Sequence, residues 1–596
     1  MKKILLLLLL VSFNFVGKLI SDSWIRINQL GYELDAVKIA VLISEENLKI
    51  KSFEIVDAIS DKVLYRSSKI ERTGAWQKFK STFRLNFSNF KKEGLYYIRA
   101  GNSKSPIFKI AKGIYNGSPD FLLQYIRQQQ CGYNPFLKDS CHTHDGFIVY
   151  HPEKEGEHIN VVGGWHDASD YLRYVTTSAT ATFQLMFAYY KNPNAFGDKF
   201  DANGDSIPDG IPDVLNSAKW GLDWLLKMNP SKGEMYHQIA DDRDHRGFRL
   251  PTEDTISYGK GLERPVYFVT GEPQGLFKYK NRTTGVASTA AKFASAFAFA
   301  TVVFKHFTDE LKSTLIEKSN DAYEFAKSKP GVCQTAPCRA PYFYEEENYV
   351  DDMALAASVL AKVLGDSIYY NEAINYLKAE PIVPWIGKDT ARHYQWYPFI
   401  NLAHFFLIEN SRGRQKQEIL NYIKSGLELI EKKSKNNPFR IGVPFIWCSN
   451  NLIASISTQF RLYHQLTGDK RFLELEASHR DWLFGCNPWG TSMIVGFPEW
   501  GDFPEEPHSA FTAIYGYPIN GGLVDGPVYT SIYKSLIGIA LHRPDEYEKF
   551  QTDYIVYHDD YGDYSTNEPT LDGTASLVMY LSFLYNPEAE RKVNRR

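Results

Sequence analysis

The sequence of 596 residues lacks the features of several common classes of protein. It has no surplus of basic residues, since 67 Lys and Arg stand against 70 Asp and Glu, and no basic stripe, so a nucleic-acid partner is not expected. Beyond its first residues it has no apolar run long enough to span a membrane. Only six cysteines are present, so disulfides cannot be the main source of stability.

The N-terminus has the pattern of a secretory signal peptide. Lys2 and Lys3 precede an unbroken apolar run, Ile4–Val11, which is too short to span a bilayer. Small polar residues follow at 21–23, and no cysteine near them indicates a lipid anchor. We therefore expect residues 1–21 to be removed and the mature protein to be periplasmic or secreted.

Residues 22–111 form short alternating runs separated by turn residues, such as KIAVLI, STFRLNF and GLYYIRA. This spacing predicts a small β-sandwich of about seven strands. The segment has no cluster of His or Cys and no catalytic pair. The interpretation favoured here is a structural module packed on the next domain, with carbohydrate binding as the alternative.

From residue 112 the apolar residues recur at helical spacing, as in TATFQLMFAYY and AAKFASAFAFATVVF. About a dozen helices are predicted, with no strand signal between them and with long Gly- and Pro-rich loops. Helical hairpins in a ring, closing into an α/α toroid of six pairs, satisfy this pattern. The face that carries the loops should carry the function.

Two acidic segments lie about 400 residues apart and both precede helices. GGWHDASDYLRY contains Asp167 and Asp170. YHDDYGDYSTNEP contains Asp559, Asp560, Asp563 and Glu568. In a closed ring the first and last helices are neighbours, which would bring the two segments to one rim. Two carboxyl groups on opposite sides of a sugar bond are what glycoside hydrolysis requires, although solvated or Ca²⁺-binding loops remain alternatives.

Several motifs resemble those of glycoside hydrolase family 9, the cellulase family. GGWHDASDY resembles its GGW-(H/Y)-DAGDY signature, and YHDDYGDYSTNEPTLDGTA resembles its second, Asp- and Glu-containing signature. GCNPWGTSMIVGFPEWGDFPEEPHSAF resembles the histidine signature, and WIRINQLGY resembles the start of the immunoglobulin-like domain of one branch. The motifs occur in the right order over nearly the whole mature chain.

The resemblance implies an immunoglobulin-like β-sandwich at residues 22–111, followed by an (α/α)₆-barrel catalytic domain at 112–590. It also implies four catalytic residues. Asp170 is the base, and Asp167 is the carboxylate that helps to hold the water. Glu568 is the proton donor, and Asp559 is its partner in the same signature. Residues implied to bind substrate are His508, Trp165 and Tyr171. The family inverts anomeric configuration, so the carboxylates should lie about 6.5–9.5 Å apart.

Three positions depart from the family pattern. Ser169 stands where a Gly is usual, and Thr574 where an Asn is usual. Ala510 replaces the Arg of the histidine signature, a rigid group with several donors for sugar hydroxyls. The base and the acid are retained, but the missing Arg makes a non-cellulosic, branched or short β-glucan more plausible as substrate.

Two kinds of metal site are suggested. Cys131, Cys141, His142 and His166 have the composition of a tetrahedral Zn²⁺ site, with a Cys131–Cys141 disulfide as the alternative. The resemblance implies a structural zinc of this composition. For Ca²⁺, one candidate loop spaces oxygen ligands at Asp201, Asn203, Asp205, Asp209 and Asp213, and a second resembles a family calcium motif at Asp351 and Asp352. A helix-entry loop is the alternative for the first.

The remaining cysteines suggest no reactive site. Cys333 and Cys338 are close enough in sequence to form a local bridge. Cys448 and Cys486 are expected to be buried thiols.

Three functions are consistent with the sequence. The first is an inverting endo-β-1,4-glucanase that acts on cellulose or related β-glucans. The second is an exo-acting β-glycosidase or cellodextrinase on short oligosaccharides, for which Ala510 is the support. The third is a carbohydrate-binding protein that has lost catalysis, which the retained Asp167, Asp170 and Glu568 oppose. A helical-toroid lyase would require a Tyr or His base instead. The sequence leaves the oligomeric state open.

Overall fold

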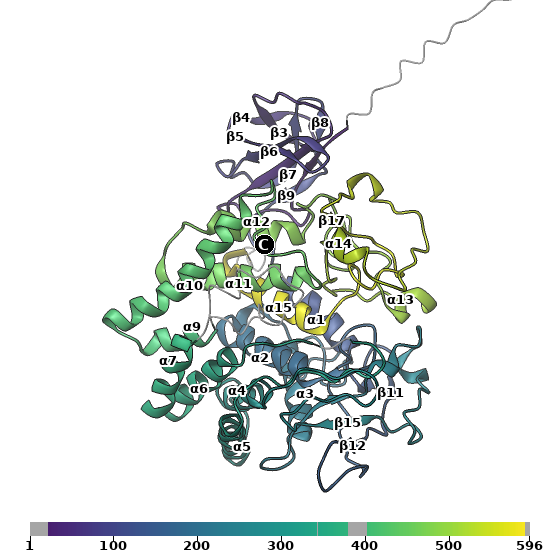
Figure 1. The fold of residues 1–596 in the computed structure, drawn as a ribbon. Helices are drawn as coiled ribbons and strands as arrows, with labels where there is room; N and C mark the ends of the chain where they lie inside the picture. The colour runs from purple at the N-terminus through teal and green to yellow at the C-terminus, as the bar shows by residue number, and fades with distance from the viewer. Residues whose placement is uncertain (1–21, 342–343, 380–401, 590–596) are drawn as a thin grey trace, which may run out of the picture.

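The computed structural model describes residues 22–341, 344–379 and 402–589, and it consists of a small β-domain seated on a large helical domain (Figure 1). The predicted signal peptide lies outside the described residues. Within the part of the chain that is described, no helix combines the length and the apolar character needed to cross a membrane.

The β-domain is a sandwich of two antiparallel sheets, as predicted, and the described residues supply nine strands. One sheet has the order β1-β2-β6-β5, and the other has the order β4-β3-β7-β8, with β9 also paired to β7. The strands are β1 Ser23–Arg26, β2 Ile39–Ser44, β3 Phe53–Asp57, β4 Val63–Ser67, β5 Ile70–Trp76, β6 Phe79–Asn86, β7 Gly94–Ala100, β8 Ser103–Lys104 and β9 Phe108–Ile110. Alternate side chains such as Phe53 and Ile55 are fully buried between the sheets.

In the described part of the helical domain, six inner helices form a ring and each is covered by an outer helix, which is the (α/α)₆ arrangement. The inner helices are α2 Val175–Lys191, α4 Ala287–Val303, α6 Val350–Leu364, α9 Leu402–Asn410, α11 Ser449–Thr467 and α15 Leu571–Ser582. The outer helices are α1 Ser118–Gln128, α3 Asp213–Met228, α5 Asp309–Ser328, α7 Ser367–Ala379, α10 Gly413–Ser434 and α12 Leu473–Leu483. The last inner helix, α15, packs against both α1 and α2, which closes the ring.

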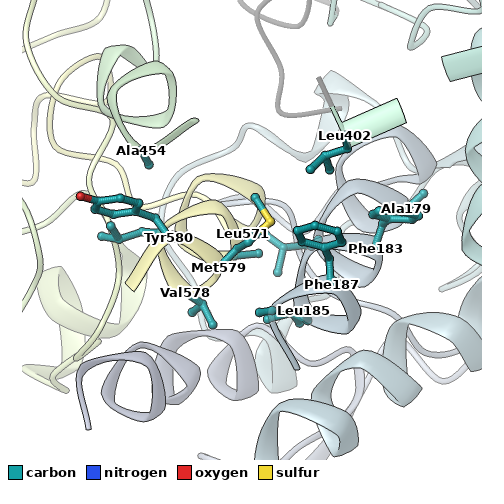
Figure 2. Packing of buried hydrophobic residues seen from close by; sticks show 14 of the residues in the cluster. Ala179, Phe183, Leu185, Phe187, Leu402, Ala454, Leu571, Val578, Met579 and Tyr580 are labelled. Carbon is teal, nitrogen blue, oxygen red and sulfur yellow. The ribbon is translucent and has the colours of Figure 1, made fainter. Parts of the chain in front are cut away.

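Inner and outer helices differ in sequence because they differ in burial. Nearly all of α4 is buried, and its Ala-rich sequence lets neighbouring helices approach closely. By contrast, α5 is polar on one face and is capped by Thr308, the residue before it, whose side chain accepts a hydrogen bond from the Leu311 N–H. Inside the ring, aromatic side chains of α2 meet those of α4, with the Phe183 and Phe299 rings 4.8 Å apart. Figure 2 shows this core where α2, α9, α11 and α15 converge.

Short strands also occur among the helices, and the expectation of none there was wrong. A four-stranded sheet has the order β12-β15-β14-β13, formed by β12 Phe147–Val149, β13 Arg173–Tyr174, β14 Tyr236–Ile239 and β15 Pro265–Phe268. Smaller elements are β10 Gly132–Asn134, β11 Asp139–Cys141, β16 Val528–Tyr529, β17 Ile555–Val556, α13 Ala510–Tyr515 and α14 Thr530–Tyr533. Strands of two to four residues are too short to give a period-2 pattern.

The β-domain packs on the helical domain through specific polar contacts. The Asn28 amide donates hydrogen bonds to Asp481 Oδ1 at 2.8 Å and to the Tyr115 hydroxyl at 3.0 Å. Arg84, which is buried, pairs with Glu474 of α12 at 2.9 Å. In Figure 1 this places the β-domain directly against α12. The prediction of a module packed on the next domain is confirmed.

Candidate active site

The two acidic segments meet at one rim of the ring, as expected from its closure. The Leu571 N–H at the start of α15 donates to the Asp167 carbonyl oxygen at 3.0 Å. Two residues further along the same loop, the Ser169 N–H donates to Glu568 Oε1 at 3.0 Å. Residues that are 399 positions apart in sequence are therefore direct neighbours.

Glycine makes the turn into the first acidic loop possible. Gly164 has a positive φ of 72°, and a Cβ at this position would come within 2.7 Å of the Trp224 ring. The next residue, Trp165, is fully buried and packs against Gly221. The prediction that Trp165 contacts substrate is wrong, because its indole belongs to the packing beneath the loop.

Asp170, the expected base, is partly exposed and is held from two sides. Its Oδ1 accepts a hydrogen bond from the Leu172 N–H at 3.1 Å, and its Oδ2 lies 3.1 Å from Nε2 of His245. Burial alone would lower the pKa of His245, but the bond to Asp170 and its charge outweigh burial and raise that pKa to about 9. His245 is therefore an imidazolium at neutral pH, held beside the carboxyl group of Asp170.

Glu568, the expected acid, is half-buried like Asp170 but has different polar neighbours. Burial raises the pKa of its carboxyl group, and the negative charge of Asp170 adds to that effect. The charge of His508 and two hydrogen bonds from Ser169 act in the other direction. Both the N–H and the hydroxyl of Ser169 donate to Oε1 of Glu568. The residue that departs from the family Gly thus holds the acid in place.

Asp167 lies deeper than the other two carboxyl groups. It is 3% exposed, and its Oδ2 accepts a short hydrogen bond from the Tyr344 hydroxyl. Burial raises the pKa of Asp167 well above its usual range, and the charges of Asp572 and Asp170 raise it further. The Tyr344 bond fixes the direction of this carboxyl group beside Asp170.

Tyr171 is a structural residue, and the prediction that it contacts substrate is wrong. Its ring packs on His142 and His166, with centroids 5.4 and 4.7 Å away, and its hydroxyl donates to the Arg249 carbonyl oxygen. Only 3% of Tyr171 is exposed. No face of the ring is left for a sugar.

Asp559 and His508 belong to one hydrogen-bonded loop assembly. Asp559 accepts hydrogen bonds from the backbone N–H groups of Glu505 and Glu506 and from the Asn567 amide. Burial raises the pKa of Asp559 to about 6 against the effect of these bonds. Nδ1 of His508 lies 2.6 Å from the Tyr561 carbonyl oxygen, which fixes a proton on that nitrogen. Asp559 is therefore a positioning residue for the loops that carry His508 and Glu568.

The other two departures from the family pattern lie within packed structure. Thr574 Oγ1 donates to the Thr570 carbonyl oxygen at 2.7 Å and accepts from the Leu523 N–H at 3.0 Å. Ala510 is 2% exposed and is the first residue of α13. The hydroxyl of Thr574 thus has two partners, whereas Ala510 offers no polar group near His508.

The four predicted zinc ligands converge. One donor atom from each of Cys131, Cys141, His142 and His166 lies within 4.8 Å of the others. Both cysteines are free thiols in this structure, which favours the metal site over a Cys131–Cys141 disulfide. Nε2 of His142 lies 3.0 Å from Asp254, which is the usual outer partner of a metal-bound imidazole. Two thiols and two imidazoles with such a partner fit a structural Zn²⁺.

The first predicted calcium loop does not form a comparable cluster. Among the described residues, no three carboxylates of this loop come together. Asp205 pairs with Lys138 at 3.0 Å. Asp213, at the start of α3, accepts hydrogen bonds from the N–H groups of Lys199 and Phe200. The loop is a helix entry, which corrects the calcium prediction for Asp201, Asn203, Asp205, Asp209 and Asp213.

The second predicted calcium site already contains a cation. Nζ of Lys292 lies 2.7 Å from Oδ2 of Asp352 and 2.6 Å from Oε1 of Glu346. All three side chains are buried. The calcium prediction for Asp351 and Asp352 is therefore wrong, because a lysine ammonium occupies the position that the carboxylates surround.

The other four cysteines, all within the described residues, are free and buried. The suggested Cys333–Cys338 bridge does not form. The expectation that Cys448 and Cys486 are buried thiols is confirmed.

Sequence reasoning missed three side chains of the site. His245 and Tyr344 contact the carboxylates from loops far away in sequence, and no motif marks them. Asp525 accepts a hydrogen bond from the Trp447 indole at 2.9 Å, and its N–H donates to the Glu568 carbonyl oxygen at 2.8 Å. The charged run DDRDHRGF, residues 241–248, contains His245, but nothing in the run itself singles out this histidine.

Comparison with known proteins identifies both domains. Residues 115–581 match the sequence profile of glycosyl hydrolase family 9, and residues 21–105 match that of the cellulase N-terminal ig-like domain. The chain is 25% identical over 508 residues to a cellodextrinase of Butyrivibrio fibrisolvens, covering 79% of this chain and 84% of the relative. It is also 25% identical over 607 residues to a xyloglucan-specific endo-beta-1,4-glucanase of Bacteroides ovatus, covering 95% and 94%.

The fold is shared with solved structures. A Zn-binding triple mutant of a GH family 9 endoglucanase superposes with a TM-score of 0.75 at 23% identity, covering 93% of this chain and 99% of that chain. The family profile spans the whole ring, including both acidic segments. The chain belongs to glycosyl hydrolase family 9, and it is a glycoside hydrolase that carries the immunoglobulin-like N-terminal domain.

Proposed function

We propose that the protein is an inverting endo-β-1,4-glucanase that hydrolyses cellulose or a related β-glucan. The observation that carries the proposal is the pairing of unlike carboxyl groups at the rim. Asp170 is bonded to the cationic His245, whereas Glu568 is half-buried and its desolvation raises its pKa. Such a pair supplies an ionised base and a protonated acid at the same pH.

Each group has one task in the reaction. Glu568 gives its proton to the glycosidic oxygen as the bond from that oxygen to the anomeric carbon breaks. Asp170 takes a proton from a water molecule, whose oxygen attacks the anomeric carbon from the opposite face. Asp167, directed by Tyr344, holds that water together with Asp170. The products carry a new hydroxyl on each side of the broken bond, and the configuration is inverted.

Proton NMR of the first-formed product tests the mechanism. A β-linked substrate should release the α-anomer first. Release of the β-anomer would indicate a covalent intermediate with carboxylates about 5–5.5 Å apart, and would overturn the proposal. The chain lengths of products from soluble mixed-linkage or xyloglucan substrates report endo action, since a wide size range should appear early.

An exo-acting cellodextrinase is the second candidate. Ala510 favours it, because the residue two positions after His508 supplies no guanidinium to bind hydroxyls of a long chain. The likeness to the Butyrivibrio fibrisolvens cellodextrinase supports it as well. Cellobiose or glucose as the sole early product, with no fall in viscosity of a polymeric substrate, would favour this function over endo action.

We further propose that Cys131, Cys141, His142 and His166 bind one structural Zn²⁺. Bound zinc would supply a crosslink between the β10–β11 hairpin and the loop that holds Asp167. His166 directly precedes Asp167, and its N–H donates to the Gln129 carbonyl oxygen at 2.8 Å. Four protein ligands leave no open position, so these residues brace the loop and take no part in the proton transfers. The N-terminal signal-peptide pattern supports an enzyme that acts outside the cytoplasm.

A further inference from the structure

A buried lysine on an inner helix of the ring has no role in the chemistry described above. Lys292 lies in the middle of α4, surrounded by small and aromatic apolar residues, and is 3% exposed. An ammonium group is costly to bury unless it is paired. To stay protonated at this depth, Lys292 therefore needs partners of opposite charge.

Two carboxylates supply that charge. Nζ of Lys292 lies 2.6 Å from Oε1 of Glu346 and 2.7 Å from Oδ2 of Asp352. Burial opposes the charge of Lys292, but Asp352 and Glu346 outweigh it and raise the pKa of the lysine. Oxygen ligands converging on a point charge form the arrangement that binds Ca²⁺ in other proteins. Here a side chain of the same protein provides the charge.

The cluster leads directly to the catalytic rim. Glu346 lies two residues after Tyr344, whose hydroxyl bonds to Asp167. The carbonyl oxygen of Glu346 accepts a hydrogen bond from Gln334 at 2.9 Å, and the Tyr344 N–H donates to Thr335 at 2.8 Å. These bonds tie Glu346 and Tyr344 to one loop, so an anchor at Glu346 limits where the Tyr344 hydroxyl can lie.

We propose that the Lys292 ammonium replaces a divalent cation as the internal counter-ion of Glu346 and Asp352, and that through this anchor it positions Tyr344 against Asp167. Lys292 is a positioning residue, since it is buried and acts on Asp167 only through Glu346 and Tyr344. The predicted effect on turnover rests on the proposed function. The claim that Lys292 takes the place of a cation does not.

Two substitutions separate the charge from the space it fills. Lys292→Met keeps the volume but removes the charge, so it should lower the melting temperature and leave no room for an ion. Lys292→Ser removes both and opens a space beside two carboxylates. It should also melt earlier, and millimolar CaCl₂ should restore much of the loss in Lys292→Ser only. Lys191→Met, at the end of α2 and away from the cluster, is the matched control and should respond to neither condition.

Turnover should follow the same pattern in zinc-loaded protein. We expect kcat to fall roughly ten- to a hundredfold in Lys292→Met and Lys292→Ser, with KM little changed, because misplacement of about 1 Å at the water-holding carboxylate affects the chemical step. Calcium should raise kcat again in Lys292→Ser. A change that were merely structural would lower stability without this split between kcat and KM.

Three results would overturn the inference. They are stabilisation of the wild-type protein by calcium with uptake of one ion per chain, wild-type stability in Lys292→Met, or no response of Lys292→Ser to calcium. If Lys292→Ser does not fold unaided, its refolding yield from urea with and without calcium gives the same decision. The melting and uptake measurements are independent of activity, so they remain valid even if the enzyme fails on every β-glucan.

Discussion

The two halves of the active-site rim hold their carboxyl groups in opposite ways. On the base side, Asp170 lies partly exposed beside the cationic His245. On the acid side, Glu568 is bonded to a neutral serine and has a raised pKa because of burial. Residues of one chemical class thus take different protonation states because of their surroundings. The difference teaches that the roles are set by neighbours rather than by the carboxyl groups themselves.

Removal of either carboxyl group should have the largest effect on activity and should show how the two groups differ. Asp170→Ala should lower kcat by about 10²–10⁴-fold, because no other group accepts the proton of the water. Glu568→Gln should cause a similar loss on ordinary glucans. With an activated aryl or fluoride glycoside, whose leaving group needs no proton, only Glu568→Gln should recover.

Steady-state rates on matched pairs of substrates measure this effect. Circular dichroism of both variants checks that the fold is retained. Equal recovery of the two variants on the fluoride would contradict the assignment of acid and base.

Zinc should matter on the base side alone, since His166 adjoins Asp167 and no ligand lies in the acid segment. Cys141→Ser should lower the melting temperature by ~5 °C or more and should lose the metal, because ligand loss removes binding energy that is part of folding. Elemental analysis of the wild-type protein should give one zinc per chain. Cys486→Ser, at a buried thiol outside the cluster, is the control. Absence of zinc together with an oxidised Cys131–Cys141 pair would refute the site.

On the acid side, Ser169 tunes the proton donor. Its hydrogen bonds stabilise the ionised form of Glu568 and so lower the pKa of that group. Ser169→Ala removes the hydroxyl and keeps the N–H, so the pKa of Glu568 should rise. The alkaline limb of the kcat profile should move to higher pH by about one unit, as expected for one hydrogen bond to a charged group. Ser169→Thr keeps a hydroxyl and serves as the control; a shift to lower pH in Ser169→Ala would contradict this account.

The smallest expected effect concerns His245 and stability. The folded-state pKa of His245 is about 9, above its ordinary value of 6.5. Its pairing should therefore stabilise the fold fully below about pH 6.5, and the contribution should disappear as the pH rises through about 9. Because 42% of the His245 side chain is exposed, we expect about 1 kcal/mol or less.

Urea unfolding of wild type and His245→Gln at several pH values measures this contribution. The difference in the free energy of unfolding should be largest at acidic pH and vanish at alkaline pH. His464→Gln, away from the rim, should show no such trend. A difference that grows with pH would have the wrong sign.

The sequence predicted those parts of the site that are carried by local motifs. Asp167 and Asp170 share one loop, Glu568 precedes a strong helix, and the closure of the ring brings them together. Trp165 and Tyr171 come from the same motif, yet both side chains are buried in the packing. Their roles were mispredicted because a motif does not tell on which face of a loop a side chain lies.

Contacts between distant loops could not be predicted in the same way. His245, Tyr344 and Lys292 depend on side chains brought together only by the fold. The calcium prediction failed at Asp352 for this reason, since nothing near Asp352 in sequence shows that a lysine of another helix meets it.

The backbone bond between Leu571 and Asp167 has a consequence for the newly made chain. A ribosome adds about 5–20 residues per second, so the segment with the base emerges roughly 20–80 s before the segment with the acid, 399 residues later. During that interval the polypeptide contains the base but lacks the acid, so it cannot hydrolyse a glycan. Hydrolytic activity therefore reports that the last helix has taken its place, and the appearance of activity during synthesis in vitro would serve as a clock for completion of the domain.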